Sequence, residues 1–209
     1  MMNQKEAWNR LYKKNQNKWR METLGLPKII NGKNILELGV GNGKTLKSII
    51  ELKPAKVAAI DLSEEAVKNA KKKFSIENES IKIRVADVTR LPFKKGEFDI
   101  VVCYYILNNL IENERKKAVK EMHRVIKPGG KVIFEDFALG DFRQKEELKR
   151  VEENTLLKND GIICHFFSIA ELKYIFSDFR NKKFTKKISY PITHKKELER
   201  VIISGKMQK

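Results

Sequence analysis

The sequence predicts an α/β fold, a doubly wound seven-stranded sheet that is mostly parallel with an antiparallel last strand. Two observations predict it. Short apolar, β-branched segments alternate along the chain with segments of helical periodicity, as expected for strands that helices cover on both faces. Three alternating glycines, Gly39, Gly41 and Gly43, follow the first of these strands, and a helical segment comes next. A strand, a glycine turn and a helix in this order are typical of a sheet that binds a nucleoside ligand at its edge.

The expected elements follow from these patterns. A first helix is indicated by Trp8, Leu11 and Tyr12 at helical spacing. The parallel strands are expected at Asn34–Leu38, Lys56–Ile60, Ile81–Ala86, Phe98–Cys103 and Lys131–Glu135. The helices between and after them are expected at Lys44–Glu51, Glu64–Phe74, Glu112–Ile126 and, behind a capping box at Ser168, up to Phe176. Phe184–Tyr190 and Glu199–Ser204 are expected as an antiparallel pair at the sheet edge.

Two signals set helix boundaries. Ser63 is a suitable cap for the second of these helices, with Glu64 and Glu65 favourable to its dipole. The segment Lys127-Pro128-Gly129-Gly130 predicts a helix stop followed by a turn.

Length and composition fit one domain. The chain has 209 residues, 41% of them hydrophobic, which is enough for a full core. We expect a single domain over 1–209, with a basic, helical N-terminal lid at 1–33 and a core at 34–209. The start lacks an apolar signal core and no run of eighteen apolar residues occurs, so a cytoplasmic protein without a membrane span is expected. Cys103 and Cys164 are interpreted as reduced core residues, and no metal-ligand cluster is predicted.

Positive charge is concentrated at the two ends of the chain. The formal net charge is +17; residues 1–34 hold eight Lys or Arg against two acids, and residues 178–209 hold ten against three. This placement suggests a polyanionic partner held by the terminal segments. Lysine-rich solubility, or a hot or salt-loaded cytoplasm, is an equally good explanation from composition alone.

The acids near the glycines decide which nucleoside is favoured. A dinucleotide fingerprint needs G-x-G-x-x-G, whereas the third glycine here comes one residue early. Glu37, two residues before Gly39, would oppose a pyrophosphate but would suit a ligand with a sulfonium and an ammonium. Asp61 ends the second strand, where a carboxylate can accept both ribose hydroxyls, and Asp87, beside apolar Val88, can accept from an adenine amino group. These residues predict S-adenosylmethionine.

From about Ile35 to Phe137 the chain resembles the class I S-adenosylmethionine-dependent methyltransferases, which are Rossmann-like. The matching segments are Leu36–Gly43, Ala59–Ser63, Ala86–Val88, Phe98–Val101 and Arg124–Gly130. The resemblance implies that the three glycines lie under the methionine part of the cofactor. It also implies that Asp61, with Leu62, takes the ribose, and that Asp87, with Val88, takes the adenine. Tyr104 is expected beside the cofactor. Trp19-Arg20 is interpreted as a lid over the cofactor, with an N-terminal packing anchor as the alternative.

The sequence after the fourth strand limits the methyl acceptor. It lacks the Asn/Asp-Pro-Pro-Tyr/Phe motif typical of amino-group methylation of adenine or cytosine. Cys103 ends a buried strand and has no adjacent proline, which argues against a covalent cysteine route to a pyrimidine carbon. A nucleophile that already carries a lone pair remains, or an acceptor activated by a residue that the sequence does not identify.

A second resemblance, to the tRNA 3-methylcytidine methyltransferases, covers shorter motifs. They are Asp141-Phe142-Arg143, Asn154, Lys158–Gly161, His165–Ser168, the N-terminal segments Trp8–Asn15 and Asn17–Arg20, and the closing Arg200–Lys209. It implies RNA, most plainly tRNA, as the partner, with the basic ends holding phosphates. Tyr105, Arg143, His165 and Phe166 are the expected substrate-binding residues.

Three of these four residues also have a purely structural interpretation. Phe166 is then a core residue, His165 is a buried histidine with its hydrogen bonds satisfied, and Arg143 pairs with Glu146 or Glu147. At the level of function, a methyltransferase acting on a small molecule or a protein side chain is the competing hypothesis, and a cofactor-binding module without chemistry is the third.

Overall fold

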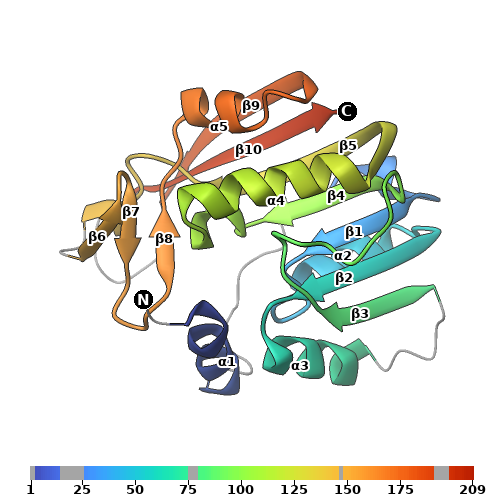
Figure 1. Cartoon of the computed structure of the whole chain (residues 1–209), viewed down its shortest axis with the longest axis horizontal. Coiled ribbons are helices and arrows are strands. Elements are labelled where there is room, and N and C mark those ends of the chain that lie inside the picture. Colours follow the sequence, from blue (N-terminus) through green and yellow to red (C-terminus); the bar gives the residue numbers. More distant parts are fainter. Residues whose placement is uncertain (1–2, 15–25, 75–79, 146–147, 191–197) are drawn as a thin grey trace.

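The computed structural model describes residues 3–14, 26–74, 80–145, 148–190 and 198–209. Within them, seven strands form one sheet in the order β3-β2-β1-β4-β5-β10-β9 (Figure 1). The strands are β1 Asn34–Leu38, β2 Lys56–Asp61, β3 Ile81–Val85, β4 Phe98–Tyr104, β5 Ile126–Phe137, β9 Arg180–Ser189 and β10 Arg200–Gln208. Strands β1 to β5 pair in parallel, whereas β10 is antiparallel to both β5 and β9. The predicted doubly wound sheet with its antiparallel last strand is confirmed.

Helices cover both faces of this sheet. On one face, α2 (Lys44–Glu51) and α3 (Glu64–Phe74) bury Leu46, Ile49 and Val67 against β1, β2 and β4. On the other face, α4 (Glu112–Val125) and α5 (Ile169–Ile175) pack against a second cluster that contains Phe134 of β5. The alternation of side chains along β1, β2 and β4 divides these strands between the two clusters, which is why their sequences are apolar throughout.

The predicted caps are present. Ser63 Oγ accepts from the amide of Ala66 at 3.1 Å, and Ser168 Oγ accepts from the amide of Glu171 at 3.0 Å. The expected helix stop is present, because α4 ends at Val125, but the expected turn at 127–130 is wrong. These residues lie within β5, where they form an irregularity. Residue Phe98 pairs with Ile126, but Ile100 pairs with Lys131, so the extra residues bulge out of the ladder.

A second, small sheet was not predicted from the sequence. Strands β6 (Lys149–Glu152), β7 (Thr155–Leu157) and β8 (Ile163–His165) form it, all antiparallel. It lies beyond the carboxyl ends of the parallel strands, at the left in Figure 1. Strands of three or four residues are too short for a period of two to be recognised in a sequence. Three short 3₁₀ turns, η1 (Lys28–Ile30), η2 (Leu107–Asn109) and η3 (Phe142–Lys145), complete the described elements.

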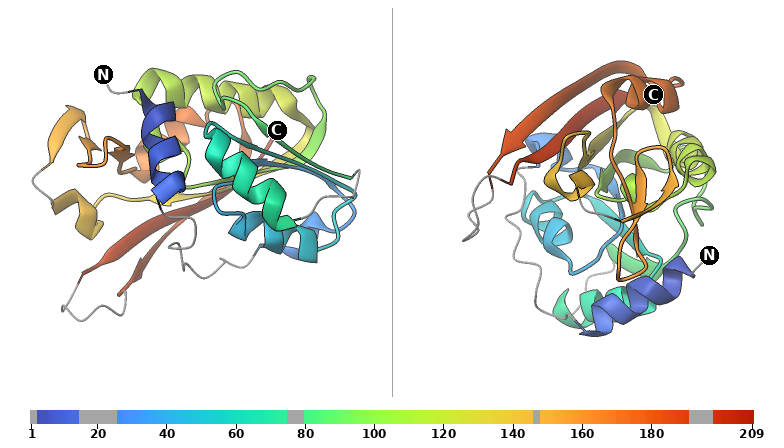
Figure 2. Two further views of the ribbon diagram at one scale, coloured as in Figure 1. Left: turned by 90° about the horizontal axis from the view of Figure 1, so that it is seen from below. Right: turned by 90° about the vertical axis from the view of Figure 1, so that its left-hand side faces the viewer.

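The N-terminal helix α1 (Gln4–Lys14) confirms the helical spacing of Trp8, Leu11 and Tyr12. It lies beside α3 (Figure 2), where Asn9 Oδ1 accepts from Ser63 Oγ at 2.7 Å. Its first residue reaches the small sheet, because Gln4 Nε2 donates to the carbonyl of Gly161 at 2.9 Å. The helix therefore bridges the main sheet and the small one. Among the described residues, none of the helices combines the length and the apolar character needed to cross a bilayer.

Candidate functional site

A cavity of about 350 Å³ lies at the carboxyl ends of the parallel strands, where the strand order reverses between β1 and β4. This is the position at which doubly wound sheets bind their ligands. Each of β1 to β5 contributes a residue at or just past its end: Gly39, Asp61, Asp87, Tyr104 and Phe137. Helix α1, the start of α2, the segment around η2 and the small sheet with its flanking loops supply most of the remaining lining.

The glycine loop after β1 brings backbone close to the cavity. Gly39 has φ +76° and Gly41 has φ +48°, and both line the cavity. A Cβ atom on Gly41 would lie 2.8 Å from the Tyr12 hydroxyl, so only glycine admits this approach of α1. Gly43, with φ +77°, precedes α2 and faces the Phe74 ring instead. It does not line the cavity, so its requirement for glycine is explained by internal packing.

Asp61 is held at the end of β2 by the loops around it. Its Oδ2 accepts from the amide of Gly41 and its Oδ1 from the amide of Ser63, both at 2.9 Å. Burial raises the pKa of Asp61 to about 6, although these amides and that of Leu62 act in the opposite direction. Each oxygen keeps a lone pair after these contacts. A pair of ligand hydroxyl groups therefore meets a fixed, bidentate acceptor at the cavity wall.

The other residues predicted to hold the cofactor differ in their placement. Leu62, Asp87, Val88 and Tyr104 all line the cavity. Asp87 Oδ1 accepts from the amide and the hydroxyl of Thr89, at 2.7 and 2.8 Å, which fixes the carboxylate. Trp19 and Arg20 lie outside the described residues.

Glu37 lies in β1 and not in the cavity wall. Its side chain is fully buried, and neither carboxylate oxygen has a hydrogen-bond partner among the described residues. Burial raises the pKa of Glu37 well above its usual range, and the charge of Asp61 raises it further. A buried carboxyl without a partner is unfavourable. The backbone amide of Leu46 acts in the opposite direction on this pKa, so the carboxyl belongs to the packed interior between β1 and α2.

Two aromatic residues of α1, which the sequence interpretation did not assign to the site, line the cavity. The rings of Trp8 and Tyr12 stack with centroids 5.7 Å apart. Burial raises the pKa of Tyr12, and the nearby Asp61 adds to the effect, so its hydroxyl stays protonated. Their spacing of four residues was the available signal, but it indicates a buried helix face as readily as a ligand contact.

Tyr105, predicted as a substrate contact, lines the cavity in a strained conformation. Its φ is +55°, which is uncommon for a residue other than glycine. Three interactions hold it there: its amide donates to the Glu135 carbonyl at 2.8 Å, its hydroxyl donates to the Glu135 carboxylate, and its ring packs 5.0 Å from that of Phe137. Strain maintained by the surrounding structure is frequent at functional sites.

Arg143 also lines the cavity, and its ion pair is with Asp141, at 2.8 Å between Nη1 and Oδ1. Glu146 and Glu147, the partners considered from the sequence, lie outside the described residues. Phe166 is fully buried and contributes to a smaller adjoining cavity rather than to the main one.

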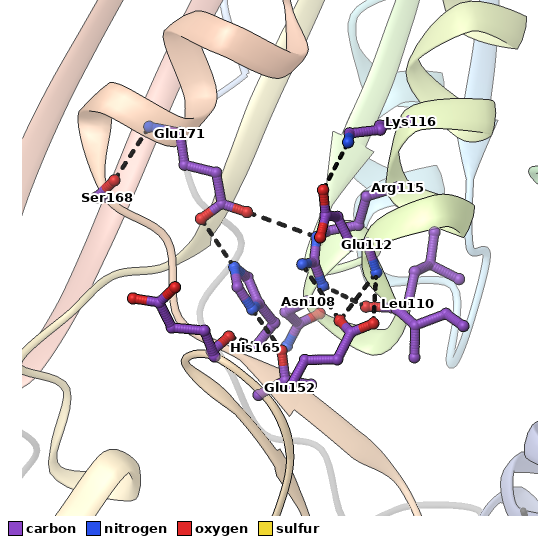
Figure 3. Close-up of polar contacts among 12 residues, drawn as sticks. Asn108, Leu110, Glu112, Arg115, Lys116, Glu152, His165, Ser168 and Glu171 are labelled. Carbon is purple, nitrogen blue, oxygen red and sulfur yellow. Dashed lines mark hydrogen bonds and ion pairs between the residues drawn. The ribbon is translucent and has the colours of Figure 1, made fainter.

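His165 is a correction to the predicted site. It is buried and does not line either cavity. Its Nδ1 lies 2.7 Å from Thr155 Oγ1 and its Nε2 lies 2.9 Å from Glu171 Oε2. Figure 3 shows the contact between His165 and Glu171. Both ring nitrogens are therefore occupied by the protein itself. The sequence alternative, a satisfied buried histidine, describes the observed contacts.

The same network contains Arg115, which no sequence pattern singled out (Figure 3). This side chain is 3% exposed and donates to the Leu110 carbonyl at 2.6 Å. Glu152 of β6 and Glu171 of α5 flank it at 3.5 and 3.6 Å. Arg115 thus connects α4, α5 and the small sheet, and fixes the loop that carries Leu110 into the cavity wall.

The environment of the cysteine side chains disfavours covalent catalysis by a thiol. Cys103 and Cys164 are free and buried, and burial raises the pKa of the Cys103 thiol well above its usual range. A neutral, buried thiol is a poor nucleophile, as expected from the sequence. No group of three or more potential metal ligands occurs within the described parts of the chain.

The fold and this cavity define a nucleoside-binding α/β protein, and comparison with known proteins narrows the class. Residues 36–134 match the family described as a methyltransferase domain. The segment runs from within β1 to within β5, so it contains the carboxyl ends of β1 to β4. This match identifies a methyltransferase domain in residues 36–134, and S-adenosylmethionine is the methyl donor that the sequence predicts for it.

Individual relatives are more distant. A tRNA N(3)-methylcytidine methyltransferase of Schizosaccharomyces pombe, trm141, is 25% identical over 183 residues, covering 78% of this chain and 73% of that protein. The tRNA N(3)-methylcytidine methyltransferase Mettl2 of Drosophila melanogaster is 25% identical over 69% of this chain, which spans only 47% of Mettl2.

A relative named for a different substrate has a similar sequence identity to this chain. A demethylmenaquinone methyltransferase of Clavibacter sepedonicus is 31% identical over 59% of this chain and 49% of its own length. Among solved structures, an S-adenosylmethionine-dependent methyltransferase of Methanosarcina mazei has a TM-score of 0.70 at 23% identity, covering 89% of this chain and 99% of that one. The structural likeness supports the fold.

Proposed function

We propose that the protein methylates a base in RNA, with tRNA as the substrate, by direct in-line transfer from S-adenosylmethionine. The observation that carries this proposal is the composition of the acceptor wall, the part of the cavity formed by Tyr105 and by Phe137 onward. This wall is aromatic and apolar, with two basic side chains. Within the described residues, neither a carboxylate nor an imidazole from residue 137 onward lines it. The carboxylate of Glu114, elsewhere in the cavity, already accepts from the amide of Ile111 at 3.1 Å.

That composition favours a nucleophile with a lone pair of its own. Burial raises the pKa of both Tyr104 and Tyr105, and nearby Glu135 raises it further, so neither phenol acts as a base near neutral pH. A pyrimidine ring nitrogen such as cytosine N3 needs no deprotonation. Its lone pair forms the bond to the methyl carbon while the carbon–sulfur bond breaks, and the positive charge passes to the base. Positioning can then supply most of the acceleration.

The cofactor would be held by the opposite half of the cavity. S-adenosylmethionine supplies an electrophilic methyl group on a sulfonium. Asp61 would accept from its ribose hydroxyls, Asp87 with Val88 would contact the adenine, and Gly39 and Gly41 would lie against the methionine part. Trp8 and Tyr12 would cover the ligand from α1, which supports a lid role for the N-terminal segment.

A polyanionic substrate agrees with the surface of β9. Lys183, Lys186 and Lys187 are exposed on this edge strand, whereas Lys182 is engaged with the carbonyls of Ser177 and Phe179 at the end of α5. Changing the three exposed lysines to glutamate should weaken tRNA binding at every sequence, and affinity of the unmodified protein should fall steeply with salt.

The test is incubation with a labelled methyl donor and separate pools of total tRNA, protein and small metabolites. Label in tRNA, found as one methylated nucleoside by mass spectrometry, is the expected result. Label in the metabolite pool, as the relationship to a quinone methyltransferase would allow, or in protein, would contradict the proposal. Label in no pool would favour a binding module.

A further inference from the structure

Two basic side chains, Arg143 and Lys158, stand together at the acceptor wall. Both line the main cavity and also a smaller adjoining cavity of about 110 Å³. Cys164 lies in both walls as well. The charges of Arg143 and Lys158 both lower the pKa of the Cys164 thiol, against the burial that raises it to about 12. Two cations from different segments therefore line both cavities beside the same thiol.

Contacts within the protein alone hold the Arg143 side chain in place. Its Cζ lies 4.4 Å from the ring centroids of both Phe137 and Phe142. Nη1 donates to Asp141, whose buried carboxylate also accepts from the amide of Val201 at 2.9 Å. The guanidinium group has five N–H donors in a rigid plane, and Asp141 takes one side of it. With 26% of its side chain exposed, Arg143 still has donors for a planar or tetrahedral anion.

Lys158 is held only loosely by its neighbour. Its Nζ lies 3.2 Å from Asp160, and the two side chains are 34% and 37% exposed. An ion pair this exposed contributes little free energy. A bound anion can therefore replace the Asp160 carboxylate as the partner of the Lys158 ammonium group at little cost. The backbone around it is firm, because the amide of Lys158 donates to the Ile162 carbonyl at 2.9 Å. The ammonium group can turn to a ligand without rearrangement of the β7–β8 connection.

We infer that Arg143 and Lys158 bind one phosphate group next to the base that receives the methyl group. The inference rests on the proposed function and narrows its substrate class to a nucleotide within a chain, as opposed to a free nucleoside. A fixed guanidinium fork matches phosphate oxygens, and an ammonium adds a point charge. The apolar floor of the smaller cavity, formed by Phe142, Leu156 and Phe166, strengthens both interactions by excluding water. The aromatic pair Tyr105 and Phe137 is adjacent and offers a stacking surface for the base.

The first test compares two lysines of the same small sheet. Lys158→Gln removes the proposed contact, and Lys149→Gln is the matched control, because Lys149 is exposed on β6 and lines neither cavity. Binding of labelled total tRNA is measured by fluorescence anisotropy at several salt concentrations. We expect Lys158→Gln to weaken binding about fivefold and to reduce the slope of log affinity against log salt by about 0.7, as loss of one single-strand phosphate contact would. Lys149→Gln should change neither quantity.

The second test predicts a gain. Asp160→Asn removes the competing charge but keeps an oxygen for the amide of Ile162, which now donates to Asp160 Oδ1 at 3.1 Å. We expect tRNA binding about twofold tighter and a steeper salt dependence. Arg143→Lys keeps the charge but loses the fork, so KM for tRNA should rise with little change in kcat. A purely structural role for Arg143 would instead lower the thermal midpoint and leave the salt slope unchanged.

The outcomes separate this inference from the proposed function. If tRNA is methylated but Lys158→Gln and Lys149→Gln behave alike, the phosphate site is wrong and the RNA proposal stands. If Asp160→Asn weakens binding, the phosphate site is again contradicted. If the wild-type protein neither methylates tRNA nor binds it in a salt-dependent manner, the proposed function itself fails.

Discussion

The cavity has two halves that are built by different means. The acceptor half contains the acceptor wall, and the cofactor half is the opposite part, which is proposed to hold S-adenosylmethionine. The cofactor half comes from residues at the ends of β1, β2 and β3, each within a short contiguous motif that continues a strand. The acceptor half gathers Tyr105, Phe137, Arg143 and Lys158 from four separate segments, and the small sheet that completes it has strands of only three or four residues. The first half is supported by the ladder of the main sheet. The second depends on side-chain contacts such as those of Arg115. The two halves should therefore respond differently to substitution.

The largest effect is expected in the cofactor half. Asp61→Ala removes the acceptor that faces the cavity and also the partner of the Gly41 and Ser63 amides. Binding of S-adenosylmethionine, measured by calorimetry, should fall at least about a hundredfold, since loss of a charged hydrogen-bond acceptor for two hydroxyls costs about 3 kcal/mol. Unchanged affinity would refute the ribose assignment. Circular dichroism serves as the control for folding.

Substitutions that disturb the acceptor half should act by lowering the free energy of unfolding. Arg115→Met leaves Glu152 and Glu171 without their buried partner and should lower the free energy of unfolding by about 3 kcal/mol. The adjacent Lys116→Met breaks only an exposed pair with Glu112 and should leave the free energy of unfolding nearly unchanged. Urea denaturation of both variants measures the difference. Equal effects would show that the Arg115 network does not support this half.

A pH effect should appear in the cofactor half. With its pKa raised to about 6, Asp61 is mostly protonated at pH 5 and mostly ionised at pH 7. Only the ionised form offers acceptors on both oxygens, so cofactor affinity should fall as pH falls, about tenfold between pH 7 and pH 5. Calorimetry across this range measures it. Asp61→Asn should bind more weakly but with a flat profile; a wild-type profile that is equally flat would contradict the assignment.

The smallest effect on cofactor affinity is expected for α1, the helix that contacts both the main sheet side and the small sheet side of the cavity. Gln4→Ala removes hydrogen bonds to the carbonyl of Gly161 and the amide of Ile163, at 2.9 and 3.4 Å. We expect cofactor affinity to fall about threefold, because the net contribution of such bonds is about 0.7 kcal/mol. Lys5→Ala, which removes only an exposed contact with Glu64, is the control and should bind normally. Faster cofactor dissociation in Gln4→Ala, measured by stopped flow, would identify α1 as the cover of the cavity.

The outcome at particular residues shows how far sequence interpretation reached. Asp61, Asp87 and Tyr104 were assigned to the cavity because parallel strands bring their carboxyl ends to one edge, which strand order alone guarantees. Gly43 and Glu37 are predicted from the glycine motif and the acid before it, but Gly43 faces the Phe74 ring and the Glu37 side chain is buried within β1. His165 and Phe166 belong to a family-like motif, yet both are buried in the structure. The helical spacing of Trp8 indicates a packed face of α1 but not that this face borders the cavity, which also includes Lys158.

The sequence by itself determined the sheet, its helices and the chemistry of the cofactor edge. These depend on local periodicity, caps and glycine conformations, which are encoded within a few residues. The tertiary structure alone decided the acceptor half. There, Arg143 is oriented by Phe137, Phe142 and Asp141, and Asp141 is fixed by Val201, sixty residues away. Contacts over such separations arise only when the chain has closed on itself, so the site that selects the methyl acceptor is a property of the folded molecule.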